Sequence, residues 1–150
     1  MKYSKINPSV NELILNQIVK WHNMTPKLWI EDYKPTEEDL KETIKRIVET
    51  EKSDLYLGIA QDDLDELVGF IWAYRKCDDE KSVMIMSLHV EPEYRNQGIA
   101  SHLKKDLESW CREIGVHSVE TTVHFDNKNM LELNQKLGYN AGMVCMKKML

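Results

Sequence analysis

The sequence predicts one mixed α/β domain spanning residues 1–150, and the hydrophobic pattern supports this fold class in three ways. Apolar residues recur at helical spacing before Leu55, alternate with a period of two from Leu55 to Arg75, and return to helical spacing after Gly98. The run Ser82–Val90 is apolar on both alternations, which is typical of a central strand covered on both faces. No repeat or low-complexity linker divides the chain. We therefore expect an antiparallel meander followed by helical crossovers, with helices on both faces of the sheet.

Two helices are expected before the meander. The first begins at Ser9, where Ser9 and Glu12 form a capping-box pattern. The second begins after Thr36, whose capping-box partner is Asp39, and it ends near Glu51. Both carry apolar residues on one face, so we expect them to pack on the sheet.

The strands are expected where β-branched and apolar residues alternate between polar turns. On the central strand, Met84, Met86, Leu88 and Val90 should face one side of the sheet, and Val83 and Ile85 the other. The expected strands are Lys2–Asn7, Leu55–Ala60, Leu67–Arg75, Ser82–Val90, Ser118–His124 and a closing strand, Tyr139–Met149.

Two helices are expected in the C-terminal half. The first carries a buried stripe from Ile99 to Ile114, and Gly115 stands where a left-handed cap is needed. Asp126 or Asn127 caps the second, which stops at Gly138.

Composition limits the class of function. Lys+Arg is 20 and Asp+Glu is 25, and the net charge of −5 argues against a general nucleic-acid binder. The N-terminus lacks the apolar core of a signal peptide, and no apolar run reaches membrane-spanning length, so we expect a cytoplasmic protein with no membrane partner. The three cysteines, Cys77, Cys111 and Cys145, form no disulfide framework or metal cluster, and we expect small buried thiols.

The loop Arg95–Ala100 joins the central strand to the next helix and has the features of an anion site. The first turn of a helix leaves backbone N–H groups unpaired, and the helix dipole favours negative charge there. Gly98 and Ala100 carry little or no side chain, so an anion such as a diphosphate can approach the backbone. Neither the Rossmann nor the Walker glycine pattern is present.

These residues resemble the acetyl-CoA signature of the GNAT superfamily of N-acetyltransferases. That signature is Arg/Gln-x-x-Gly-x-Gly/Ala after a central strand, and Arg95, Gly98 and Ala100 stand at its positions. A second similarity lies downstream, where Asn127 is followed by a short helix and then by Gly138 and Tyr139. The resemblance implies a GNAT-like fold whose central strand splays from its neighbour, an N-acetyltransferase activity, and acetyl-CoA as co-substrate.

The resemblance also implies roles for individual residues. The backbone N–H of Val90 would polarise the thioester, and the amides from Arg95 to Ser101 would hold the diphosphate. Asn127 would contact the arm of the cofactor, and Lys136 would approach the 3′-phosphate. The expected cofactor-binding residues are Leu88, Val90, Arg95, Asn96, Gln97, Gly98, Ile99, Ala100, Ser101, Asn127 and Lys136.

The chain departs from the family at the general acid and the general base. Many members carry a tyrosine four residues before the glycine of the late segment, where it protonates the leaving thiolate. Here that position is Asn134, whose amide has no proton to give near neutral pH. The family's base often lies on the alternation that includes Val90, which here offers no titratable side chain. The remaining candidates are His22, Glu31, Asp32, His89 and His124.

The function expected from the sequence is acetyl transfer to a primary amine by direct attack in a ternary complex. The acceptor is a small molecule or a peptide, and the free alternation Tyr139–Met149 suggests a homodimer. Two alternatives stay open: an acyl-CoA-binding regulatory module with little or no catalysis, and a scaffold without a cofactor.

Overall fold

Five strands form one mixed sheet in the computed structural model, which describes residues 1–150. The strand order is β1-β2-β3-β4-β5, and every neighbouring pair is antiparallel except β4 and β5, which are parallel. The strands are β1 (Lys2–Lys5), β2 (Leu55–Gln61), β3 (Leu67–Arg75), β4 (Ser82–Val90) and β5 (Ser118–Thr121). The expected mixed α/β fold with an initial antiparallel meander is therefore confirmed.

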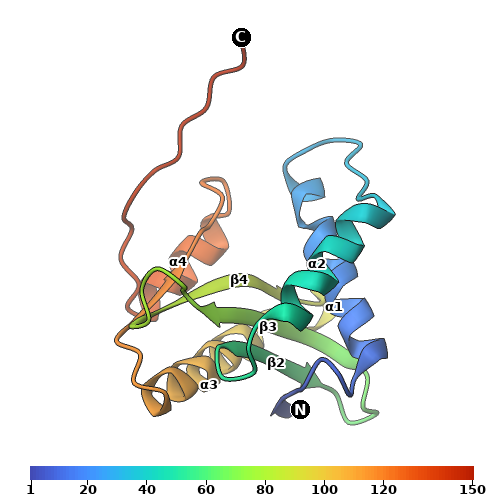
Figure 1. The fold of residues 1–150 in the computed structure, drawn as a ribbon. Helices are drawn as coiled ribbons and strands as arrows, with labels where there is room; N and C mark the ends of the chain where they lie inside the picture. The colour runs from blue at the N-terminus through green and yellow to red at the C-terminus, as the bar shows by residue number, and fades with distance from the viewer.

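Helices cover both faces of the sheet (Figure 1). The helices are α1 (Glu12–Met24), α2 (Glu37–Glu49), α3 (Ile99–Glu113) and α4 (Lys128–Lys136), with short 3-10 helices η1 (Thr25–Leu28) and η2 (Pro92–Tyr94). One core lies between α1, α2 and the sheet and includes Leu57, Phe70 and Trp72. The other lies under α3 and includes Ile71 and Leu107. None of the helices is long and apolar enough to cross a membrane.

The two N-terminal caps differ from each other. At α2 the expected capping box is present: the Asp39 N–H donates to Thr36 Oγ1 at 3.1 Å, and the Thr36 N–H donates to Asp39 Oδ2 at 2.8 Å. At α1 the expected Ser9 cap is wrong, because the Ser9 N–H donates to Asn7 Oδ1 in a turn and the helix begins only at Glu12. Because the Asn7 side chain accepts the Ser9 N–H, this donor is not available to the Glu12 side chain for a capping box.

A bulge in β4 changes which of its residues share a face. Trp72 pairs with Ser87 but Ala73 pairs with Ile85, so Met86 has no partner on β3. A bulge of this kind inserts one residue and reverses the alternation beyond it. Consequently Leu88 and Val90 pack on the α3 side, whereas Met86 packs on the α1 side. The prediction that Met84 and Met86 share a face with Leu88 and Val90 is therefore wrong.

The C-terminal segment forms no strand, so the expected closing strand Tyr139–Met149 is wrong. Residues 140–150 are extended, fully exposed chain that leaves the body of the molecule (Figure 1). β5 is also shorter than expected, because it ends at Thr121 and the next residues turn away to the start of α4. Cys145 lies in the tail and Cys77 in a turn, and both are exposed, so only Cys111 is the buried thiol that we expected.

Candidate active site

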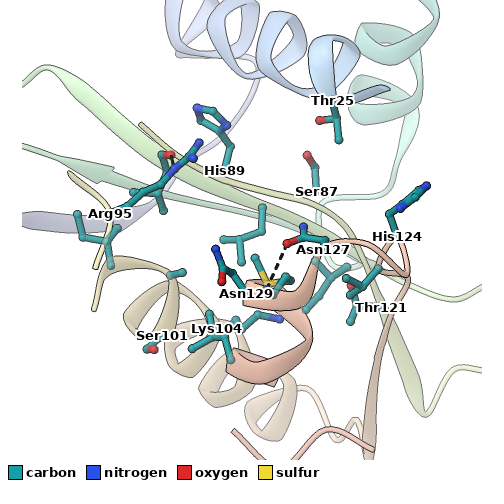
Figure 2. A pocket seen from close by; sticks show the side chains of 18 of the residues that line it. Thr25, Ser87, His89, Arg95, Ser101, Lys104, Thr121, His124, Asn127 and Asn129 are labelled. Atoms are coloured by element: carbon teal, nitrogen blue, oxygen red, sulfur yellow. Dashed lines mark hydrogen bonds between the residues drawn. The ribbon is translucent and has the colours of Figure 1, made fainter. Parts of the chain in front are cut away.

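A cleft of about 740 Å³ opens where β4 parts from β5. β5 pairs only with the first half of β4, from Ser82 to Ile85, so the second half of β4 has no neighbour on that side. This is the splay that the family resemblance implied. The start of α3 borders one end of the cleft, and α1, η1 and the loop after β5 border the other (Figure 2).

Two backbone N–H groups of β4 point into this opening. The Glu91 N–H donates to the carbonyl of Val68 on the β3 side at 2.8 Å. Along an antiparallel pair the direction of the N–H groups alternates, so those of Val90 and Leu88 point away from β3. No strand lies on that side beyond Ile85. The splay therefore leaves two ordered donors facing a cleft.

The loop before α3 presents a second set of unpaired donors. Asn96 and Gly98 both adopt the left-handed conformation, with φ values of 59° and 82°. Gly98 is the N-cap residue, and no side chain caps the helix. The helical ladder begins with the His102 N–H, which donates to the Gly98 carbonyl at 3.0 Å. The N–H groups from Ile99 to Ser101 therefore stay free for an anion.

Arg95 fixes this loop to the end of β4. Its Nε donates to the carbonyl of Val90 at 2.9 Å. The hydrogen bond holds the anion-binding turn beside the strand whose N–H groups face the cleft. The arginine therefore positions this loop through its hydrogen bond to the backbone of β4.

The structure brings most of the expected cofactor-binding residues to the cleft. Asn127 accepts a hydrogen bond from the Met130 N–H at 3.2 Å, which caps α4 and places the start of this helix at the cleft (Figure 2). Gln97 does not line the cleft, because its side chain turns away and donates to the Glu93 carbonyl at 3.2 Å. The expected residues that line the cleft are Leu88, Val90, Arg95, Asn96, Gly98, Ile99, Ala100, Ser101, Asn127 and Lys136.

Asn134 is not brought to the cleft. Its side chain is only 5% exposed, is absent from the lining, and leaves its Oδ1 without a hydrogen-bond partner. Its carbonyl accepts the N–H groups of Leu137 and Tyr139, which end α4. In this arrangement Asn134 belongs to the packing of the helix end.

Three of the candidate base residues line the cleft. His22, His89 and His124 line it, whereas Glu31 and Asp32 lie in an exposed loop and do not. Burial lowers the pKa of His89 to about 4, and the nearby charge of Arg95 lowers it further in the same direction. Burial, assisted by Arg46, also lowers the pKa of His22. Both imidazoles are therefore neutral at pH 7, and His89 is a weak base.

Aromatic packing holds these histidines in place. The ring centroids of His89 and Trp21 lie 4.6 Å apart. The ring of His124 stacks on that of Trp29, with a centroid distance of 4.0 Å and an interplanar angle of 4°. The Trp29–His124 pair joins η1 to the loop after β5, two segments far apart in sequence. No sequence motif marks this wall of the cleft.

One further residue of the lining was missed from the sequence. Lys104 lines the cleft from α3 and is only 1% exposed. A signal was present, because Lys104 stands in the stripe formed by Ala100, Leu107 and Cys111 at helical spacing. A charged residue on the buried face of an amphipathic helix is unusual.

The geometry of the cleft limits the kind of ligand that it can bind. A parallel strand pair that splays beside a helix N-terminus, with inward-facing backbone donors, suits an extended anionic cofactor and a second substrate entering from the opposite end. Residues 15–139 match the model of the acetyltransferase (GNAT) family. The chain belongs to this family, which confirms the expected membership and the expected acyltransferase class of enzyme. Acetyl-CoA is the co-substrate that this membership implies.

The individual relatives of the chain share limited sequence identity with it. The chain is 35% identical over 72 residues to the L-2,4-diaminobutyric acid acetyltransferase of Vibrio parahaemolyticus, a match covering 48% of this chain and 40% of that enzyme. It is 27% identical over 123 residues to the Vibrio cholerae enzyme of the same name, covering 73% and 71% of the two chains.

Among solved structures, the chain resembles AAC(6')-Iy in complex with the bisubstrate analogue CoA-S-monomethyl-acetylneamine. The TM-score is 0.69 at 18% identity, with 99% of this chain and 98% of that chain covered. At this identity the likeness concerns the fold.

Proposed function

We propose that the protein transfers an acetyl group from acetyl-CoA to the primary amine of a small molecule by direct attack in a ternary complex. The observation that carries this proposal is the opening between β4 and β5. Unpaired N–H groups of Leu88 and Val90 face it, the free helix start at Gly98 borders one end, and a histidine-lined pocket borders the other. Two substrates can therefore meet at the splayed half of β4.

The backbone carries out most of the chemistry in this proposal. The N–H of Val90 hydrogen-bonds to the thioester carbonyl and stabilises the oxyanion that forms when the amine attacks. One such donor contributes about 3 kcal/mol of transition-state stabilisation. The amides from Arg95 to Ser101, including that of Gln97, hold the diphosphate, while Asn127 and Lys136 contact the arm and the 3′-phosphate.

The acceptor loses its proton without a strong protein base. His89 is neutral at pH 7 but has a pKa of about 4, so it accepts a hydrogen bond more readily than a proton. The amine therefore enters neutral, and water in the cleft removes the proton after attack. The CoA thiolate leaves without a protein acid, since a thiol with a pKa near 8.5 is a tolerable leaving group.

The acceptor binds against the Trp29–His124 pair, beside Ser87 and His22. The aromatic wall and the neutral imidazoles suit a small polar amine. Relatives of the chain are named for diaminobutyrate, and a structural neighbour holds an aminoglycoside-derived analogue, so both amine classes belong in a first screen.

The test is release of free CoA thiol from acetyl-CoA across a panel of amines. The panel should contain 2,4-diaminobutyrate, an aminoglycoside, a polyamine and a peptide with a free N-terminus. We expect turnover on at least one small amine, with an acetamide detected by mass spectrometry. Thiol release no faster than hydrolysis across the whole panel would count against the proposal.

A second candidate function is acyl-CoA binding without catalysis, as in a regulatory module. It is favoured by two observations: Asn134 lies outside the cleft, and the pKa of His89 makes it a weak base. Tight CoA binding without turnover on any amine would support it. Absence of any thermal shift with millimolar acetyl-CoA would instead indicate a scaffold without a cofactor.

We further propose that the protein is a homodimer that exchanges its C-terminal segment. β5 is an edge strand with one open side, and the extended tail exposes apolar residues such as Met143, Val144 and Met146. An unpaired strand edge and an unpaired extended segment satisfy each other's backbone groups when two copies meet. Light scattering should give a dimer for residues 1–150 and a monomer for residues 1–139. A full chain that stays monomeric at high concentration would exclude the exchange.

A further inference from the structure

We propose that Lys104 is a phosphate-binding residue of the cofactor cleft, whose amine pairs with the diphosphate of CoA. This inference rests on the use of acetyl-CoA, and it adds a side-chain charge to a site otherwise built from backbone N–H groups. Figure 2 shows Lys104 on the α3 side of the cleft, next to Ser101.

The position of Lys104 on α3 favours this role. It follows Ala100 by four residues and Ser101 by three, so it lies on the same face of the helix as these two residues of the first turn. Three residues of α-helix rise about 4.5 Å, and helical side chains lean toward the N-terminus. A lysine side chain spans this distance, so the amine can reach an anion held at the first turn.

No carboxylate forms an ion pair with this amine. The ion pairs on α3 join His102 to Asp106 and Arg112 to Glu108, and Lys104 takes part in neither. Glu108 is also engaged by the hydroxyl of Tyr139 at 3.5 Å. The Nζ of Lys104 rests over the Tyr139 ring, 4.5 Å from its centroid. A buried cation that rests on an aromatic face and makes no ion pair leaves most of its hydrogen-bonding capacity free.

The surroundings determine how the amine titrates. Burial lowers the pKa of Lys104 to about 8, and Glu108 partly offsets this shift. Burial raises the pKa of the Cys111 thiol to about 11. It also raises the pKa of the Tyr139 hydroxyl well above its usual value, so both groups are neutral at pH 8. Glu132 and Lys136 of α4 are the charged side chains that line the same cleft from the opposite helix.

A structural role alone does not require the amine. The position is buried in the stripe of α3, where a methionine of similar length would pack without the penalty of burying a charge. The amine therefore adds binding capacity at some cost in stability, which is characteristic of a group that meets a ligand.

Proton linkage gives a signature that packing cannot produce. Near pH 8 part of the Lys104 population is neutral, and pairing with a phosphate raises the pKa of the amine. CoA binding at pH 8 should therefore take up as much as about half a proton per site. Because the charged form binds, affinity should decrease as the pH rises through 8.

The experiment is calorimetric titration of CoA at pH 8 in two buffers with different ionisation enthalpies. The variants are wild type, Lys104→Met, and Lys105→Met, which removes the same charge from an exposed neighbour on α3. We expect Lys104→Met to bind CoA about 10- to 100-fold more weakly, with this proton uptake abolished. Lys105→Met should retain both the CoA affinity and the proton uptake of wild type. Lys104→Arg should retain most of the CoA affinity but should show no proton uptake.

Truncated ligands locate the contact. Lys104→Met should weaken the binding of 3′-dephospho-CoA by the same factor as the binding of CoA. It should not weaken the binding of pantetheine, which has no phosphate. Unchanged CoA affinity and proton uptake in a folded Lys104→Met variant would overturn the inference, as would an equal loss for pantetheine. A loss for CoA but not for 3′-dephospho-CoA would overturn the diphosphate assignment in favour of the 3′-phosphate. Wild type that binds no CoA at all would instead overturn the use of acetyl-CoA, and the inference with it.

Discussion

The two ends of the cleft are built in different ways. At the proposed cofactor end, most of the groups are backbone N–H donors from one continuous segment, the end of β4 and the loop before α3. At the acceptor end, the groups are side chains from α1, η1, the β4 bulge and the loop after β5, and Trp29 and His124 stand 95 positions apart.

Only one of the two ends depends mainly on local sequence. A backbone donor needs only the right conformation, so a left-handed Gly98 and a helix start are sufficient. A wall made of side chains depends on how distant segments pack. We therefore expect substitutions at the cofactor end to abolish function and substitutions at the acceptor end to change its specificity.

The largest effect is expected for Gly98→Glu. The substitution places a carboxylate among the N–H groups that we propose bind the diphosphate, in a left-handed conformation that disfavours any side chain. CoA affinity, measured by calorimetry, should fall at least about 100-fold. Gly115→Glu is the matched control, since Gly115 also has a positive φ of 77° and an added Cβ meets nothing there. Equal affinities of the two variants would contradict the placement of the diphosphate.

A smaller loss is expected for Val90→Pro, which removes one donor from the splayed half of β4. The N–H of Val90 points away from β3, so no ladder hydrogen bond is lost. We expect kcat to fall about 100-fold while the Kd for CoA changes little, as for loss of one oxyanion donor. His89→Pro, which would break the ladder to β3, should instead unfold the strand. A normal kcat in a folded Val90→Pro variant would remove Val90 from the mechanism.

His89 should affect stability rather than the rate. Its pKa is lowered to about 4 in the folded protein. As the pH falls, His89 is therefore protonated near pH 6.5 in the unfolded chain but only near pH 4 in the folded protein. Between these values the free energy of unfolding should decrease by up to about 3 kcal/mol from this residue. Urea unfolding at pH 7.5 and pH 4.5 should show a smaller decrease for His89→Gln. The exposed His117→Gln should behave as wild type, and an unchanged pH dependence in His89→Gln would refute the account.

The smallest effect is expected for Trp29→Ala at the acceptor end. Removal of one side of the stack on His124 should raise KM for the acceptor about 5-fold and leave the Kd for CoA unchanged. Phe125→Ala is the control, because Phe125 stacks on the same imidazole at 4.8 Å but does not line the cleft. If both variants raise KM equally, the stack orders His124 and does not contact the acceptor.

Sequence patterns located most of the helices and strands, and the misses have physical causes. The capping box at Thr36 was predictable because both partners lie within one turn. The cap at Ser9 was not, because Asn7 competes for the same donor. The tail was expected as a strand from its alternation, but a strand also needs a neighbour, and none lies beside residues 140–150.

The candidate site divides in the same way. The turn and helix start at one end of the cleft could be predicted from local sequence, since Arg95, Gly98 and Ala100 specify them through local backbone preferences. The bulge at Met86, the three histidines in the cleft lining and the burial of Lys104 are visible only in the folded structure. These depend on how β3 pairs with β4 and how α3 packs beside α4. Such long-range packing is not encoded in the spacing of any one segment.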